Sequence, residues 1–102
     1  MAEEVEEKKV VKLEGVSGKW VEESQTFGIS AYVRNGKGKL VHFTCKPDLK
    51  VYTMIPKPGE PLVSDYEYVE ASYVAMPEVN EARITVEVNG VSKSVTVKRE
   101  TK

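Results

Sequence analysis

Histidine and cysteine often carry acid–base and nucleophilic chemistry near neutral pH, and the sequence holds one of each, His42 and Cys45. Both lie in an alternating segment, residues 41–46, whose pattern predicts a β-strand. Side chains three residues apart on a strand point to opposite faces, so the two cannot share a metal ion or form a nucleophile–base pair. Cys45 falls on the apolar face with Val41 and Phe43, which predicts an inert thiol. The sequence therefore favours a protein that is not an enzyme.

Acidic and glycine-rich segments offer no better site. The glutamates at positions 3, 4, 6 and 7 and at 22 and 23 lack the spacing of a calcium loop, and we expect solvated charge there. The segment Gly36-Lys37-Gly38-Lys39 is too short for a phosphate-binding loop and is followed by a predicted strand rather than a helix. We expect neither a metal site nor a cofactor.

The elements that position these residues are clearest at the C-terminal end. Alternating runs flank Asn89-Gly90, the dipeptide that favours a type I′ turn between paired strands. A two-residue loop fixes the register, with these predicted cross-strand pairs: Val88 with Val91, Val86 with Lys93, Ile84 with Val95, and Ala82 with Val97. One face of this hairpin is apolar and the other is polar. Lys93 interrupts the apolar face, so we expect the core to end before it.

A second hairpin is predicted around Gly36-Lys37-Gly38. If these residues form a three-residue loop with a left-handed glycine, the apolar faces of residues 27–33 and 41–45 coincide. The predicted pairs are Val33 with Val41, Ala31 with Phe43, and Ile29 with Cys45. The same register places Tyr32 opposite His42 on the outer face.

Other segments are less uniform. Residues 10–21 are interpreted as two short strands or one bent strand, with Trp20 favoured as a core anchor over a ligand-stacking residue. Residues 49–55 alternate as a strand, with Leu49, Val51, Thr53 and Ile55 on one face and Lys50, Tyr52 and Met54 on its reverse. The proline-rich residues 56–61 are interpreted as a crossover within one domain. Residues 64–76 fit both a strand and a helix, and their tyrosines and valines favour the strand.

The count of about seven strands predicts an all-β fold, an antiparallel β-sandwich of immunoglobulin-like or fibronectin-like form, with a small β-barrel as the competitor. Residues 1–8 are expected to be a charged flexible tail and residues 9–102 a single β domain. The 102 residues carry 15 basic and 16 acidic side chains, a net charge of −1, and their lysine and glutamate usage resembles that of hyperthermophile proteins. A lone cysteine, a charged beginning and no long apolar run predict a cytoplasmic protein without a membrane span. No motif points to a known family.

Two hypotheses of function remain open. The first is a non-catalytic interaction or structural module that presents a loop or sheet edge to a protein partner or to a second copy. Its candidate binding residues are Tyr32, His42, Tyr52, Lys57, Pro58, Glu60 and Pro61. The alternative is a small barrel that binds single-stranded nucleic acid, against which the balanced charge counts. Its candidate residues are Tyr32, Arg34, Lys37, Lys39, Lys46 and Lys50.

Overall fold

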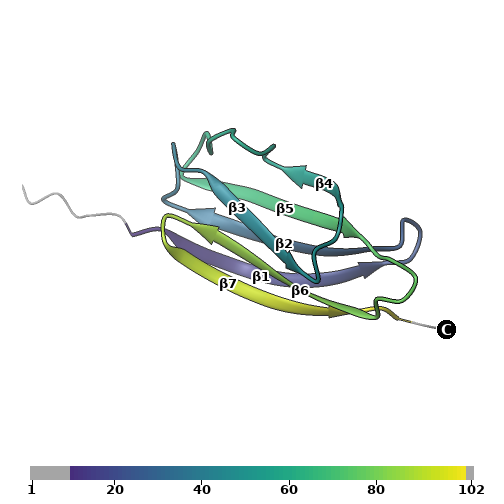
Figure 1. Cartoon of the computed structure of the whole chain (residues 1–102). Helices are drawn as coiled ribbons and strands as arrows, with labels where there is room; N and C mark the ends of the chain where they lie inside the picture. Colours follow the sequence, from purple (N-terminus) through teal and green to yellow (C-terminus); the bar gives the residue numbers. More distant parts are fainter. Residues whose placement is uncertain (1–9, 101–102) are drawn as a thin grey trace, which may run out of the picture.

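The computed structural model describes residues 10–100 and is built from seven antiparallel strands in two sheets (Figure 1). The strands are β1 Lys12–Val21, β2 Thr26–Arg34, β3 Val41–Lys46, β4 Val51–Ile55, β5 Tyr66–Val74, β6 Glu81–Val88 and β7 Val91–Lys98. The predicted all-β sandwich is confirmed. The competing small barrel is wrong, because the sheets stay open. The predicted tail at residues 1–8 lies outside the described residues. No helix in residues 10–100 is long and apolar enough to cross a membrane.

The first sheet has four strands in the order β1-β2-β5-β4, and the second has three in the order β3-β6-β7. On one side of the sandwich β1 lies alongside β7 (Figure 1). The approach is close there, because a Cβ atom added to Gly18 of β1 would lie 2.7 Å from Cγ2 of Val97 on β7. On the opposite side, β3 and β4 each pair with one neighbouring strand in the described part of the chain.

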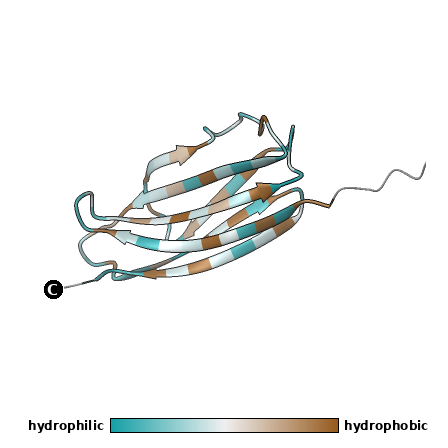
Figure 2. Cartoon of the chain, turned by 180° about the vertical axis from the view of Figure 1, so that it is seen from behind, coloured by the Kyte–Doolittle hydropathy of each residue, from teal (hydrophilic) through white to brown (hydrophobic). Residues whose placement is uncertain are grey.

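Alternation along the central strands builds the core between the sheets. Hydrophobic and hydrophilic residues form successive bands along each strand (Figure 2). The inward positions of β2, β5 and β6 are buried: Phe27, Ile29, Ala31, Val33, Val69, Ala71, Tyr73, Ala82, Ile84, Val86 and Val88. Each fully buried valine, isoleucine or phenylalanine contributes about 1.5–3 kcal/mol relative to exposure.

The C-terminal hairpin has the predicted register at all four pairs. Asn89 and Gly90 both take positive φ angles, 50° and 85°, as a type I′ turn requires. Lys93 is exposed, yet the core does not end before it, because Val86 opposite it and Val88 nearer the turn are both 0 % exposed. β6 is the central strand of its sheet and pairs with β3 on one side and with β7, which carries Lys93, on the other.

β2 and β3 do not form the predicted hairpin. They belong to different sheets, so the predicted pairs Val33–Val41, Ala31–Phe43 and Ile29–Cys45 are wrong. The chain leaves the first sheet because residues 35–40 are bonded to residues 62–65: Asn35 N donates to Asp65 O at 2.7 Å, Gly38 N to Leu62 O at 2.8 Å, and Leu62 N to Lys39 O at 2.9 Å. Gly38 does take the predicted left-handed conformation, with φ 84°.

The strand pairing also assigns three further segments. Residues 12–21 form one strand with a bulge between Glu14 and Ser17, which confirms the bent-strand alternative. β5 confirms the strand interpretation of residues 64–76. Residues 56–65 join β4 to its neighbour β5 in the same sheet, so the predicted crossover is wrong.

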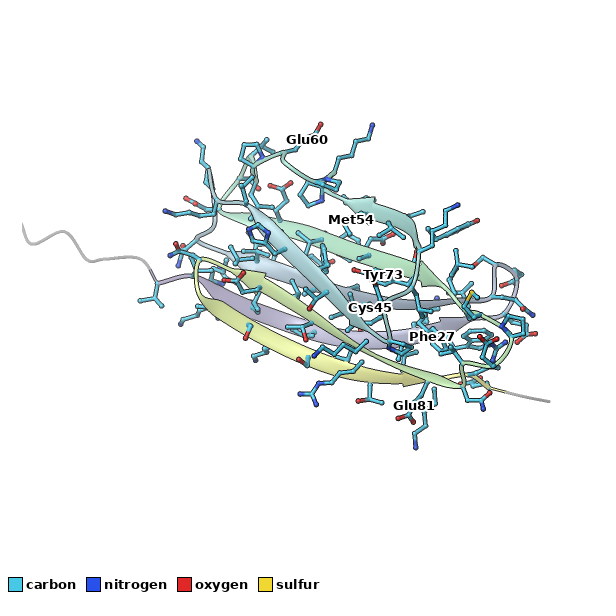
Figure 3. All side chains as sticks on the ribbon, in the orientation of Figure 1. Phe27, Cys45, Met54, Glu60, Tyr73 and Glu81 are labelled. Atoms are coloured by element: carbon cyan, nitrogen blue, oxygen red, sulfur yellow. The ribbon has the colours of Figure 1, made fainter. Side chains whose placement is uncertain are left out.

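β4 differs from its predicted alternation. The pairing with β5 shifts between Val51 and Thr53, so Tyr52 is an extra residue and the strand exchanges faces at that point. Met54, predicted on the reverse face, packs against the core, while Ile55 is exposed. Figure 3 shows Met54, Cys45 and Tyr73 between the sheets, whereas Glu60 projects from the connection that follows β4.

Candidate functional site

The structure divides the sequence-predicted residues among three regions. Lys37, Lys39, Lys57, Pro58, Glu60 and Pro61 lie on the connections 35–40 and 56–65, at the end of the sandwich where β3 begins. Tyr32 and Arg34 lie on the outer face of the four-stranded sheet. Lys46, Lys50 and Tyr52 lie near the end of β3 and the start of β4. β3 separates the first and third groups by about 17 Å, at roughly 3.3 Å per residue.

Tyr32 and His42 do not form the predicted outer-face spot. Tyr32 lies between Glu14 and Tyr68 in the first sheet, whereas His42 is exposed on β3 opposite Glu87 in the second. The cause is the separation of β2 and β3 into different sheets. The prediction that His42 and Cys45 face opposite sides of one strand is confirmed by their burial, because His42 is exposed and Cys45 packs against the core.

The connections 35–40 and 56–65 are joined to each other by backbone hydrogen bonds. Within the second, Glu60 N donates to Lys57 O at 3.0 Å in a turn that contains Gly59, whose φ is 88°. Leu62 is buried beneath them. The charged side chains at this end project into solvent.

Aromatic rings cluster at one end of the outer face of the first sheet. The Tyr32 and Tyr66 rings stack with centroids 5.1 Å apart, and Tyr68 meets Tyr32 edge-on at 5.4 Å. The Arg34 guanidinium lies 4.5 Å from the Tyr66 centroid and donates from Nε and Nη2 to the carboxylate of Glu14 at 2.8 and 3.2 Å. These hydrogen bonds lower the pKa of Glu14 and raise that of Arg34.

This cluster bears on nucleic-acid binding. Stacking bases requires free ring faces, and phosphate binding requires free cations. Here Tyr32 and Tyr66 stack on each other and Arg34 is bonded to Glu14. The predicted lysines are divided between two ends of β3. No finding tests nucleic-acid binding directly, and that alternative stays a prediction.

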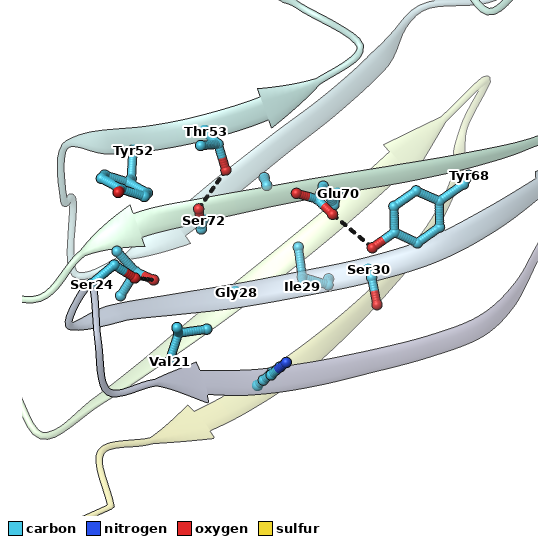
Figure 4. Close-up of a pocket in the computed structure, with 13 residues that line it drawn as sticks. Val21, Ser24, Gly28, Ile29, Ser30, Tyr52, Thr53, Tyr68, Glu70 and Ser72 are labelled. Atoms are coloured by element: carbon cyan, nitrogen blue, oxygen red, sulfur yellow. Dashed lines mark hydrogen bonds between the residues drawn. The ribbon is translucent and has the colours of Figure 1, made fainter.

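A groove of about 370 Å³ crosses the remainder of the same outer face (Figure 4). Most of its polar lining is hydroxyl. The hydroxyl-bearing residues are Ser24, Thr26, Ser30, Tyr52, Thr53, Tyr68 and Ser72. Thr53 Oγ1 of β4 lies 2.6 Å from Ser72 Oγ of β5, and Ser24 Oγ in the turn before β2 lies 2.9 Å from Thr26 Oγ1.

The groove exists because the outward residues at its centre are small. Gly28 of β2 lies opposite Ser72 of β5 and Ser30 lies opposite Glu70, whereas the following outward pair is Tyr32 with Tyr68. Tyr68 borders the groove and donates its hydroxyl to Glu70 Oε1 at 2.7 Å, which raises the pKa of Tyr68. Sequence reasoning missed this groove. Its signal was the small outward residues Gly28 and Ser30 on a strand otherwise identified correctly.

Apolar side chains on the edge strand β4 form a second candidate surface. Val51, Tyr52 and Ile55 are 44 %, 55 % and 48 % exposed, and we call these three residues the β4 edge surface. Tyr52 was among the predicted binding residues, whereas Val51 and Ile55 were not. The exposure of Ile55 depends on the bulge at Tyr52, which the sequence pattern does not mark, because the bulge places Ile55 opposite the outward Glu70. Val51 precedes the bulge and lies opposite the buried Tyr73 at the open edge of the sheet.

The described residues carry little catalytic chemistry. Burial raises the pKa of the Cys45 thiol to about 11, so the nucleophilic thiolate is disfavoured at neutral pH. Trp20 packs against the core, 5.1 Å from the Phe27 ring, and is covered by the Arg99 guanidinium at 4.9 Å. Within residues 10–100, no three histidine, cysteine, aspartate or glutamate side chains are grouped as metal ligands.

Comparison of the chain with protein-family models, curated proteins and solved structures finds no match. The outer face and the β4 edge surface are the two features of the described structure that bear on function.

Proposed function

We propose that this chain is a non-catalytic interaction module that presents the β4 edge surface to a protein partner, the first candidate being a second copy of itself. The observation that carries the proposal is the exposure of Val51, Tyr52 and Ile55 on an edge strand. Large apolar side chains exposed along the free edge of a sheet can mark a protein interaction site. An immunoglobulin-like form is part of this proposal. It is supported by the strand order, which is that of constant-type immunoglobulin sandwiches.

Side chains, rather than the β4 backbone, would make the contact. β4 has five residues and is bulged at Tyr52, and short length and bulges both limit the addition of another strand to an edge. The partner surface would therefore be apolar, matched to Val51, Tyr52 and Ile55. Desolvation of the Tyr52 ring would make it the main anchor, because tyrosine is enriched among residues that dominate binding energy.

Position in the sandwich favours this surface over the other edges. β1 and β7 cover each other, so their outer edges offer little space. β3 has a free edge, but its outward side chains, His42, Thr44 and Lys46, are polar. A cytoplasmic setting also belongs to the proposal, and the lone Cys45 supports it, since secreted domains of this size commonly rely on disulfides.

Sedimentation velocity tests the self-association form of this proposal. The wild-type chain is expected to shift from monomer to dimer as its concentration rises, and Ile55→Lys to remain monomeric because a charge would be buried without a partner. Thr96→Lys is the matched control, because it adds the same charge to an exposed position on β7 in the other sheet. It should dimerise as the wild type does.

A photo-crosslinking residue at position 52 tests the form that uses a different protein. The crosslinking residue is introduced into the chain expressed in cells, and the control carries it at position 96, which is exposed on β7 in the other sheet. A monomeric wild-type chain at every concentration, together with no adduct specific to position 52, would contradict the proposal.

A further inference from the structure

The floor of the outer-face groove contains a glycine that folding does not explain. The chain has seven glycines. Four take positive φ angles, and Gly18 and Gly36 have contacts below 3 Å at the position of an added Cβ. Gly28 has neither feature. Its nearest neighbours would be 3.6 Å from a Cβ, its φ is not left-handed, and its pairing with Lys19 and Ser72 is regular.

A glycine inside a regular strand weakens the strand, and such glycines often mark places where a ligand approaches the backbone. Gly28 is in the groove lining, on its outward face. An added side chain there would project into the groove rather than into the core. The open floor is therefore a feature of the groove, and it comes at the expense of strand stability.

Hydroxyl groups around this floor indicate the chemistry of the ligand. Ser30, Ser72 and Thr53 each offer one donor and two acceptor sites, and pairing within the protein leaves part of that capacity free. A ligand that matches them must also offer groups that both donate and accept. Tyr68 borders the groove and offers a ring for the C–H face of a sugar (Figure 4).

Charge in the groove favours a neutral ligand. Among the described residues lining it, Lys19 is the one cation and Glu70 the one carboxylate. Glu70 is held by the Tyr68 hydroxyl at 2.7 Å and would repel phosphate. A peptide fits less well, because the strand backbone groups beneath the groove are paired in the sheet. The volume of 370 Å³ lies within the range of small-molecule sites, about 300–1,000 Å³.

We propose that this groove binds a neutral oligosaccharide, whose hydroxyls pair with the serine and threonine hydroxyls and one of whose rings packs on Tyr68. It is a binding site rather than a hydrolytic one, since glycoside hydrolysis commonly needs two carboxyl groups across the sugar and the lining described here supplies only Glu70.

Titration of the ¹⁵N-labelled chain with maltotriose, cellotriose and N,N′,N″-triacetylchitotriose, each up to about 10 mM, tests the proposal by detecting dissociation constants in the millimolar range or below. At least one of these trisaccharides is expected to bind, with amide shifts concentrated on β2, β4 and β5. Gly28→Val should weaken binding at least about tenfold while raising the thermal midpoint, because the side chain fills the groove and favours the strand. Ser92→Val, on the exposed face of β7, is the control and should bind as the wild type does.

The combination of weaker binding and higher stability separates this proposal from a merely structural effect of the substitution. Tyr68→Phe should weaken binding several-fold without unfolding the chain, because it removes the hydroxyl that holds Glu70. Lack of binding by all three trisaccharides would overturn the proposal. So would equal binding by Gly28→Val, or shifts centred on Gly28 and Ser30 of β2, away from β4, that depend on protein concentration alone, which would identify a second copy as the occupant of the groove.

Discussion

The same substitution, glycine to alanine, should have opposite effects at Gly18 and Gly28. The two residues lie on adjacent strands of the first sheet, with Gly18 opposite Ile29 and Gly28 opposite Lys19. A Cβ at Gly18 would lie 2.7 Å from Cγ2 of Val97, whereas a Cβ at Gly28 would have no neighbour nearer than 3.6 Å. The pair therefore tests both the closed side of the sandwich and the open floor of the groove.

The expected magnitudes follow from these distances. Replacing a strand glycine with alanine gains about 0.5–1 kcal/mol through the reduced freedom of the unfolded chain. Gly28→Ala should keep this gain and raise the midpoint of thermal unfolding by about 2–6 °C for a domain of this size. At Gly18 the added methyl meets Val97, a stiff β-branched side chain that is buried, and overpacking costs about 1–3 kcal/mol. Gly18→Ala should therefore lose about 1–2 kcal/mol overall.

Guanidinium unfolding followed by Trp20 fluorescence measures both changes, since Trp20 is the one tryptophan and packs on the Phe27 ring. The slope of free energy against denaturant should stay constant while the midpoint moves. Combining Gly18→Ala with Val97→Ala should cost less than the sum of the two single changes, by about 1 kcal/mol, because the closest contact is removed while Val95 Cγ2 stays 3.1 Å from the added Cβ. If Gly18→Ala stabilised the chain, the close contact between β1 and β7 would be refuted. If Gly28→Ala destabilised it, Gly28 would have a structural role and the saccharide inference would lose its main support.

Four further outcomes are expected. Arg99→Ala should lower stability by about 1.5–3 kcal/mol in the same unfolding assay, because Arg99 Nε and Nη2 donate to the backbone carbonyls of Met76 and Val79 at 2.7–3.2 Å. Arg99→Lys should restore only part of this loss. Gly90→Ala should cost about 1–2 kcal/mol through its positive φ alone, since no atom lies within 4 Å of the added Cβ. Cys45 should react slowly with iodoacetamide at pH 8 and faster up to about pH 11. Because its folded pKa is raised from 9.0 to about 11, stability should fall as pH rises through that interval, and Cys45→Ala should remove this contribution. Labelled single-stranded DNA should show no mobility shift at low salt, and a shift that disappears at high salt would instead support the nucleic-acid alternative.

Local signals in the sequence predicted the strands and one hairpin correctly. Asn89-Gly90 determines both a turn type and a register, so the pairs from Val88–Val91 to Ala82–Val97 could be assigned without a structure. The strand count and the opposite orientation of His42 and Cys45 also depend only on alternation. These properties belong to one strand or to two strands joined by a short loop.

The sheet that each strand joins, and the strand it pairs with there, could not be predicted in the same way. The apolar faces of β2 and β3 fit a hairpin as well as they fit opposite sheets, and the deciding bonds come from Leu62 and Asp65, which are distant in sequence. The bulge at Tyr52 exchanges the faces of β4 without a glycine or any other local mark. Both candidate surfaces depend on these features, since the groove requires the placement of β5 beside β2 and the exposure of Ile55 in the β4 edge surface requires the bulge.

The contact of β1 with β7 limits how this chain could assemble. Growth into a filament requires two different complementary surfaces on each molecule, so that every added copy leaves a site for the next. Among the described strands, β1 and β7 pack together at Gly18 and Val97 on one flank, and β3 and β4 form the open flank. Two copies that meet through Val51, Tyr52 and Ile55 would use the same patch on both molecules and consume it. Assembly through this surface would therefore close at a symmetric pair, with no end from which a fibre could extend.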